Sequence, residues 1–222
     1  MSDSHSGFVP LLHVRLAPEE ALRRAREFCA ELVTRRSVRH FSSDPLPDGV
    51  LDLCIAAAAS APSGANKQPW SFVVVKDPAT RQLLRHAVEE EERRFYAERI
   101  SAQWREDLRP IGTSWEKPYV EEAPALIVVF RQTHGVEGDR RMAHYYTQES
   151  VGIAVGFLLA ALHHAGIATL THTPAPMQFL ERLLQRPANE RAFMLIPVGY
   201  PAEGCRVPNL PRKSLDEVRV VR

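Results

Sequence analysis

The sequence predicts one domain of the α+β class. Its 222 residues are enough to bury one large core, although length alone would also allow two domains. Segments with the apolar spacing of helices are mixed along the chain with short runs of β-branched and aromatic residues. No repeat, low-complexity tract or linker separates these segments, so we expect them to share one core. The order of the segments leaves open whether the strands run parallel.

The first predicted helix begins at Pro18. A proline fixes φ at the first helical position, and Glu19 and Glu20 place carboxylates at the positive end of the helix dipole. Apolar side chains then recur on one face, at positions 21, 25, 28 and 32. Residues 1–16 carry no strong pattern and are expected to form an N-terminal arm. Residues 42–49, after the helix, are rich in turn-forming residues.

The middle of the chain predicts a helix, a strand and a second, longer helix. An alanine-rich helix is expected over residues 50–60 and a buried strand over 71–76. The longer helix is expected over 79–104, with the acidic run at 89–91 on a solvent-exposed face. Residues 105–122 are too irregular for one element and too aromatic for a plain linker, which indicates a lid over a ligand site.

The second half predicts two long strands around an unusual helix. A buried strand is expected over 125–130, a turn over 134–139, and a helix over 144–165 that is apolar on nearly every side. Such a helix needs cover all round, from the core or from a second subunit. A short strand over 167–174, a helix over 179–185 and a strand over 192–199 follow. Pro197 predicts that this last strand lies at an edge or at a bulge. The tail, 205–222, ends in a short extended run over 218–221.

Composition excludes several classes of protein. The net charge of +1 gives no general attraction to nucleic acid or to an anionic membrane. Three cysteines without ligand spacing indicate free thiols in a reducing compartment and no metal site. The N-terminus lacks the features of a signal peptide, and the longest apolar run, 151–162, is too short to cross a bilayer. We therefore expect a cytoplasmic protein.

Two short motifs indicate chemistry. Arg35, Arg36, Ser37 and Arg39 offer guanidinium forks and a hydroxyl that suit a phosphate, although such a cluster is often only a solvated surface. Pro62, Ser63 and Gly64 end a helix just before a buried strand. Gly64 allows a close backbone approach, to a ligand or simply at a helix stop.

Together these motifs resemble the flavin-binding half of the nitroreductase superfamily. The likeness runs from about residue 34 to 220. It implies a three-layer fold with a central mixed sheet flanked by helices, an intertwined homodimer, and FMN at the subunit interface. The C-terminal residues 205–222 would extend onto the partner subunit. The cofactor-binding residues that the resemblance implies are Arg35, Arg36, Ser37, Arg39, Pro62, Ser63, Gly64, Thr171, His172, Thr173 and Arg212.

Within that superfamily the sequence is most similar to the iodotyrosine deiodinases. That group holds the amino-acid end of its substrate with a glutamate, a tyrosine four residues later and a lysine in the following lid, here Glu92, Tyr96 and Lys117. By the same resemblance the backbone amide of Ala65 takes the phenolate oxygen, and Thr173 donates to flavin N5 as the catalytic residue. The implied reaction is FMN-dependent reductive dehalogenation of mono- and diiodotyrosine to tyrosine and iodide. NADPH, directly or through a reductase, would supply the electrons.

Other functions stay open from the sequence. A general NAD(P)H-dependent nitroreductase or quinone reductase of the same fold is the main alternative. A relative that dismantles its reduced flavin to make the lower ligand of cobalamin, and a non-catalytic flavin- or nucleotide-binding module, are two more. His172 departs from the vertebrate pattern, where threonine stands in the middle of a run of three. A histidine titrates near neutral pH, and a threonine does not.

Overall fold

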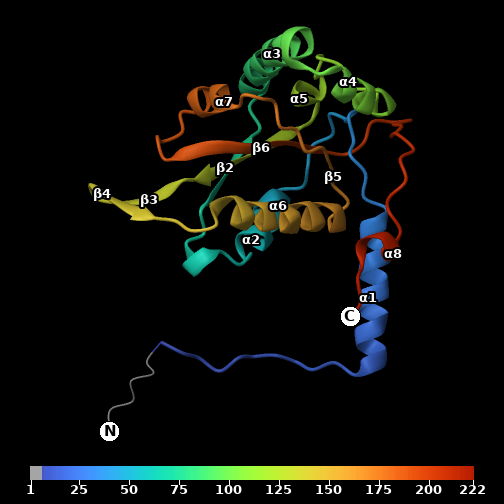
Figure 1. The fold of residues 1–222 in the computed structure, drawn as a ribbon, viewed down its shortest axis with the longest axis vertical. Helices are drawn as coiled ribbons and strands as arrows, with labels where there is room; N and C mark the ends of the chain where they lie inside the picture. The colour runs from blue at the N-terminus through green and yellow to red at the C-terminus, as the bar shows by residue number, and fades with distance from the viewer. Residues whose placement is uncertain (1–6) are drawn as a thin grey trace. The chain divides into compact units, whose positions relative to one another are not determined.

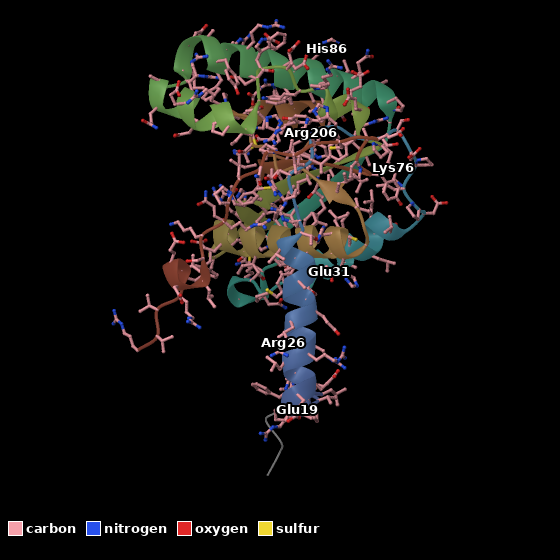
Figure 2. The ribbon with its side chains drawn as sticks, turned by 90° about the vertical axis from the view of Figure 1, so that its right-hand side faces the viewer. Glu19, Arg26, Glu31, Lys76, His86 and Arg206 are labelled. Carbon is pink, nitrogen blue, oxygen red and sulfur yellow. The ribbon has the colours of Figure 1, made fainter. Side chains whose placement is uncertain are left out.

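The computed structural model describes residues 7–222 and divides the chain into two compact units, Met1–Arg35 and Arg36–Arg222 (Figure 1). The first unit contains helix α1, Pro18–Val33, which confirms the helix expected from Pro18. Ion pairs on its surface join Arg23 to Glu20 at 2.8 Å and to Glu27 at 2.6 Å. No residue of α1 is buried, and charged side chains such as Arg26 project along its length (Figure 2).

The second unit is built on a four-stranded sheet with the strand order β1-β2-β6-β5. Its strands are β1 (Trp70–Val75), β2 (Ala125–Gln132), β5 (Ala168–Thr169) and β6 (Glu190–Gly199), and neighbouring strands pair antiparallel. A parallel bridge joins Ser37 to Thr169 outside the named strands, so the segment before α2 runs beside β5. The long apolar runs became β1, β2 and β6 because both faces of this sheet are covered.

Helices cover the sheet on both sides (Figure 1). On one side lie α2 (Val50–Ala59) and α6 (Thr147–His164), which pack on Ile127, Val129 and Ile196. On the other side lie α3 (Pro78–Arg94), α5 (Tyr119–Glu122) and α7 (Gln178–Leu183), over a core that includes Leu126 and Val128. Alternate residues of β2 therefore feed two separate cores, as the pleat of a strand requires. The predicted α+β architecture is confirmed.

The helix predicted over 79–104 is wrong in its second half. Helix α3 continues into a π-helical turn, Phe95–Arg99, and stops at Ile100, whose backbone is extended. A new helix, α4 (Ala102–Leu108), begins after Ser101, whose hydroxyl accepts the Trp104 amide at 3.1 Å. A 3₁₀ turn, Arg109–Ile111, follows. Neither proline nor glycine marks this break, so only the capping serine could have indicated it.

Three further boundaries differ from the prediction. The stretch expected as a turn over 134–139 is a hairpin of β3 (His134–Glu137) and β4 (Arg140–Ala143). Helix α6 begins three residues later than expected, at Thr147. The strand expected over 167–174 is reduced to β5, followed by a bridge between His172 and Leu195.

Pro197 does not lie on an edge strand, because β6 sits between β2 and β5. Its carbonyl accepts the Leu170 amide at 3.3 Å, but the proline has no N–H to return the bond. Pairing with β5 therefore ends at this point. The bulge of the sheet lies elsewhere, opposite Val129 and Phe130.

The C-terminal tail is exposed and contains a short helix, α8 (Leu215–Val218). A capping box between Ser214 and Glu217 starts it, so Val218 is helical and the expected extended run begins only at Arg219. In the part of the chain that the structure describes, no helix is both long and apolar enough to cross a membrane. Cys29, Cys54 and Cys205 are free thiols, as expected.

Candidate active site

A cavity of about 180 Å³ lies on the α3 side of the sheet. The end of α3, the π-helical turn, α4, the loop before α5 and the segment after β5 all contribute to its wall. The lining combines charged, hydroxyl and aromatic groups: Arg39, Glu92, Phe95, Tyr96, Trp104, Leu108, Thr113, Lys117, Tyr119, Leu170, Thr171, His172, Thr173 and Ala175.

A buried ion pair crosses this wall. Lys117 Nζ lies 3.3 Å from Glu92 Oε2, and the two residues are 3% and 9% exposed. The ammonium also donates to Thr113 Oγ1 at 3.2 Å and to the carbonyl of Ser114. A charge out of contact with water needs this number of partners. The loop before α5 therefore supplies both the lysine and the groups that hold it.

Tyr96 follows Glu92 by one turn, as the four-residue spacing predicts. Its hydroxyl donates to the Thr113 carbonyl at 3.4 Å, and its ring centroid lies 5.5 Å from Lys117 Nζ. The three residues predicted to hold an amino acid, Glu92, Tyr96 and Lys117, are thus brought together around one cavity.

His172 completes the contacts of the Glu92 carboxylate. Its Nε2 lies 2.8 Å from Glu92 Oε1, and its ring meets the Tyr119 ring edge to face at 5.7 Å between centroids. Thr171 and Thr173 lie on either side and are exposed, while His172 is buried, as alternation along an extended segment requires. Both hydroxyl residues line the cavity with the imidazole.

Burial and charge together shift the ionisation of this cluster. Burial works to raise the pKa of the Glu92 carboxyl, but the His172 hydrogen bond and the Lys117 charge outweigh it and hold that pKa below 4.5. Burial lowers the pKa of Lys117 below 10.5 against the attraction of Glu92. Burial also raises the pKa of Tyr96, with Glu92 adding to the effect. Glu92 is therefore ionised at neutral pH.

Glu89 also serves this site, which corrects its assignment to a solvent-exposed face. Its side chain is 14% exposed and pairs with Arg85 at 2.9 Å, and it accepts the Lys117 backbone amide at 2.8 Å. Glu90 fits the expectation, since its exposed carboxylate pairs with Arg94 four residues later. Glu91 also departs from the expectation, since its side chain is 13% exposed and pairs with Arg99 of the π-helical turn. Of this acidic run only Glu90 is exposed.

A family comparison identifies what kind of protein carries this cavity. Residues 32–200 match the model of the nitroreductase family. The chain belongs to the nitroreductase family. The match covers the sheet, the helices on both of its sides and every residue that lines the cavity.

Within the nitroreductase family, the chain is similar to iodotyrosine deiodinases. The chain is 52% identical over 216 residues to an iodotyrosine deiodinase of Haliscomenobacter hydrossis, covering 96% of this chain and 97% of that protein. It is 45% identical to iodotyrosine deiodinase 1 of Sus scrofa, covering 99% and 76%. A crystal structure of oxidized iodotyrosine deiodinase bound to FMN and 3-iodo-L-tyrosine superposes with a TM-score of 0.76 at 32% identity, over 88% of this chain and 97% of that one. The resemblance seen in the sequence is confirmed, and with it the prediction of an oxidoreductase of this family.

Part of the basic motif at residues 35–39 lies beside the cavity. Val38 donates to the Thr169 carbonyl at 3.0 Å, next to the bridge from Ser37, so Arg39 reaches the cavity wall. Arg39 Nε is buried without a hydrogen-bond partner among the described residues. Arg36 donates to the Pro208 carbonyl. This geometry leaves a guanidinium donor available to a ligand.

The second motif lies on the other side of the sheet. Gly64 donates to Ser150 Oγ at 3.4 Å, and a Cβ on Gly64 would stand 2.7 Å from the Tyr145 carbonyl oxygen. The close approach that this glycine allows is therefore to the segment before α6. Pro62 is exposed, Ser63 Oγ accepts the Gln68 amide at 2.9 Å, and Ala65 has a φ of 49°. One copy of the chain does not bring this loop to the cavity.

The cavity lining also lacks four other predicted residues, Arg35, Arg36, Ser37 and Arg212. Arg35 ends the first compact unit, and the residues of the cavity belong to the second. Arg212 lies in the exposed C-terminal tail. Sequence reasoning also missed Thr113, which contacts both Lys117 and Tyr96, and Tyr119 beside His172. The one available signal for Thr113 was its place four residues before Lys117.

Proposed function

We propose that this chain is an FMN-dependent reductive dehalogenase of halogenated tyrosines, which converts mono- and diiodotyrosine to tyrosine and iodide. The observation that carries the proposal is the convergence of Glu92, Tyr96 and Lys117 on one cavity. A free amino acid carries an ammonium and a carboxylate, and this cavity offers an anion and donors for them at short range. The similarity to iodotyrosine deiodinases over nearly the whole chain supports the same function.

The groups around the cavity fit an FMN. Arg39 has a buried donor without a partner, and Thr171 and Thr173 present two exposed hydroxyls to the same space. Arg35, Arg36, Ser37, Arg39 and Arg212 would hold the phosphate and the polar edge of the ring, with Thr171, His172 and Thr173 at the isoalloxazine. When bound, FMN supplies the two electrons that, with one proton, replace the carbon–iodine bond by a carbon–hydrogen bond and release iodide.

The chain's own residues bind and orient the substrate. Glu92 receives the ammonium, and Lys117 with the Tyr96 hydroxyl receives the carboxylate. Both charged partners are buried, and such pairs are stronger there than at a surface. The Ala65 amide would hold the phenolate oxygen, and the Thr173 hydroxyl would donate a hydrogen bond at the cofactor.

Residues 105–122 would act as the lid of this site. Their C-terminal part is α5, whose Tyr119 and Val120 are buried in the core. The part able to move is therefore the one that precedes Lys117, which includes Thr113 and Ser114. Ligand binding would order it, because it carries the partners of both the lysine and the tyrosine.

A homodimer would complete the site. The loop with Pro62, Ser63, Gly64 and Ala65 lies on the α6 side of the sheet and the cavity on the α3 side, so a second copy has to supply one of them. Helix α6 offers a face for that copy, since Ile153 and Phe157 are 43% and 44% exposed beside Gly152 and Gly156. An apolar helix face of this kind is normally covered. The tail 205–222 would lie on the partner subunit.

An anaerobic titration tests the function. The protein, loaded with FMN and reduced with dithionite, is mixed with 3-iodotyrosine while flavin absorbance and free iodide are followed. We expect flavin reoxidation and one iodide for each reduced flavin. If a nitroarene or a quinone reoxidises the flavin and 3-iodotyrosine does not, the chain is instead a general nitroreductase or quinone reductase of the same fold. NADPH, alone or with a reductase, is the expected electron donor.

A further inference from the structure

His172 is a buried titratable residue of the cavity whose side chain the proposed reaction leaves without a task in substrate binding. It is 9% exposed. Its backbone is fixed by the sheet, because its amide and carbonyl both pair with Leu195 of β6 at 2.9 Å. Its ring is fixed by Tyr119 on one side and by Glu92 on another. The imidazole is therefore part of the rigid framework of the site.

The Glu92 carboxylate is held at both oxygens by groups of different mobility. Oε2 faces Lys117 at 3.3 Å, and the ammonium of that lysine is held by Thr113 and Ser114 of the segment that we propose to move. Oε1 faces His172 Nε2 at 2.8 Å, and that histidine belongs to the sheet. When that segment opens, the ammonium loses two of its partners, whereas the bond to His172 still orients the carboxylate.

We propose that His172 is a positioning residue for the ammonium of the substrate: its Nε2–H holds Glu92 Oε1, so that Oε2 is presented to the incoming amino acid. The inference rests on the proposed function, which makes Glu92 the partner of that ammonium. A carboxylate that one donor already orients loses less conformational entropy when it binds the substrate ammonium. The hydrogen bond from His172 therefore strengthens ligand binding.

The surroundings of the ring favour its neutral form with the proton on Nε2. His172 Nδ1 is buried without a hydrogen-bond partner in the described part of the chain, so a proton there would meet no acceptor. Burial lowers the pKa of His172 below 6.5 against the attraction of Glu92, and the charges of Lys117 and Arg39 lower it further. The facing Tyr119 phenol is neutral, because burial raises its pKa.

Acid would reverse this arrangement. Because the folded pKa of His172 lies below its ordinary value, the ring is neutral at pH 7 and takes up a proton only as the pH falls below 6.5. An imidazolium beside Glu92 competes with the substrate ammonium for the same carboxylate. Amino-acid binding therefore weakens in acid, while binding of an iodophenol, which has no ammonium, is unaffected by this proton.

Two substitutions distinguish the hydrogen bond from His172 to Glu92 from simple packing of the His172 side chain. In His172→Gln the amide nitrogen stands close to the position of Nε2, so a donor to Glu92 remains but no longer titrates. In His172→Asn the amide stands close to the position of Nδ1 and is too short to reach Oε1. Both keep a polar side chain of smaller volume, and both keep the backbone pairing with Leu195.

The measurement is equilibrium binding to the oxidised FMN protein, followed by flavin absorbance, for 3-iodotyrosine and 2-iodophenol. We use the ratio of the two Kd values, which cancels the shared titration of the phenol. At pH 7.5 we expect His172→Asn to raise the Kd of 3-iodotyrosine about tenfold and His172→Gln to stay within about threefold, with 2-iodophenol unchanged in both. As the pH falls from about 8 to below 6.5, the wild-type preference for the amino acid should decrease, and the His172→Gln ratio should stay level.

Several outcomes would overturn the inference. One is that His172→Asn binds 3-iodotyrosine as tightly as the wild type while Glu92→Gln binds it more weakly. The amino-acid site would then exist, but His172 would have no role in it. Equal losses in the Gln and Asn variants would show that the donor at Nε2 is not what matters. If the Asn variant does not fold, the pH dependence of the Gln variant decides. The proposal would be contradicted if the Kd ratio of His172→Gln changed in acid as much as that of the wild type. A wild-type protein that binds both ligands equally would overturn this inference and the proposed function together.

Discussion

The backbone amide of Lys117 donates to Glu89 Oε1 over 2.8 Å, so helix α3 holds the main chain of this loop as well as its side chain. Glu89 and Glu92 are three residues apart on α3 and therefore face the same loop. One carboxylate anchors the backbone of Lys117 and the other pairs with its ammonium. The orientation of the lysine thus depends on two acidic residues, of which only one is predicted to touch the substrate.

We expect Glu89→Ala to destabilise the protein by about 1.5–3 kcal/mol, because it removes charge-assisted hydrogen bonds from the Lys117 amide and from Arg85. It should also weaken 3-iodotyrosine binding without touching the ligand. Urea denaturation and a binding titration measure the two effects. Glu90→Ala is the matched control, since its exposed pair with Arg94 is worth about 1 kcal/mol or less. Equal effects of the two substitutions would contradict the anchoring role.

Glu92→Gln should raise the Kd of 3-iodotyrosine by about 10- to 100-fold, on the scale of removing one partner from a desolvated charge pair. The Kd of 2-iodophenol should not rise, because the phenol lacks the ammonium. Flavin absorbance on titration with each ligand measures both constants. Glu98→Gln, on the exposed side of the π-helical turn, is the control. A parallel loss for both ligands would mean that Glu92 supports the fold rather than the zwitterion.

Thr173→Ala should slow dehalogenation by about 2- to 10-fold, the scale of one neutral hydrogen bond, while FMN stays bound. Reduction of a nitroarene by the same variant should be unaffected or faster. Single-turnover mixing of the reduced protein with each acceptor gives the two rates. Thr171→Ala is the neighbouring control. If it, and not Thr173→Ala, slows dehalogenation selectively, the hydrogen bond at the cofactor belongs to Thr171.

Arg39→Ala should weaken FMN retention by about 10- to 100-fold, because a charge-assisted bond to a phosphate is worth about 1.5–3 kcal/mol. Arg36→Ala and Arg212→Ala should act in the same direction. Equilibrium dialysis of the flavin against each variant measures the change. Arg182→Ala, on the exposed surface of α7, should retain FMN as the wild type does. Unchanged retention in all three test variants would exclude these arginines from the cofactor site.

Phe157→Glu should convert the predicted homodimer to monomers and release FMN at the same time. In a monomer, the loop with Gly64 would be separated from the cavity that the other subunit provides. Light scattering after size exclusion and the flavin-to-protein ratio measure the two results. Leu83→Glu is the matched control, since this exposed leucine lies on α3, away from the α6 face. A monomer that keeps FMN tightly would contradict the interface and the shared site alike.

The elements that the sequence predicted well are those with a strong periodic pattern or a cap. Strands β1, β2 and β6 are runs rich in apolar residues, of which β2 is the most deeply buried, and α1 begins at Pro18 as expected. The four-residue spacing of Glu92 and Tyr96 placed both on one cavity. These features depend on residues close together in sequence, and local chemistry decides them.

The features that the sequence did not predict depend on contacts between distant segments. The break at Ile100 replaces a helix that local propensity favours, and α4 then closes the cavity with Trp104. Glu89 looked like a surface residue until the loop with Lys117 folded over it, 28 residues further along the chain. His172 likewise meets Glu92 across 80 residues. No pattern within one segment carries that information.

The ion pair of Glu92 and Lys117 also bears on which ligands the cavity rejects. A halotyrosine that inserts its ammonium and carboxylate exchanges one internal pair for two new ones, and total charge in the cavity stays balanced. An amine without a carboxylate, or an acid without an amine, would separate Glu92 from Lys117 and leave one of them buried without an opposite charge, a loss of up to about 3–5 kcal/mol. The proposed function therefore predicts selectivity for whole amino acids over their decarboxylated or deaminated products, as a consequence of an ion pair that the resting site already contains.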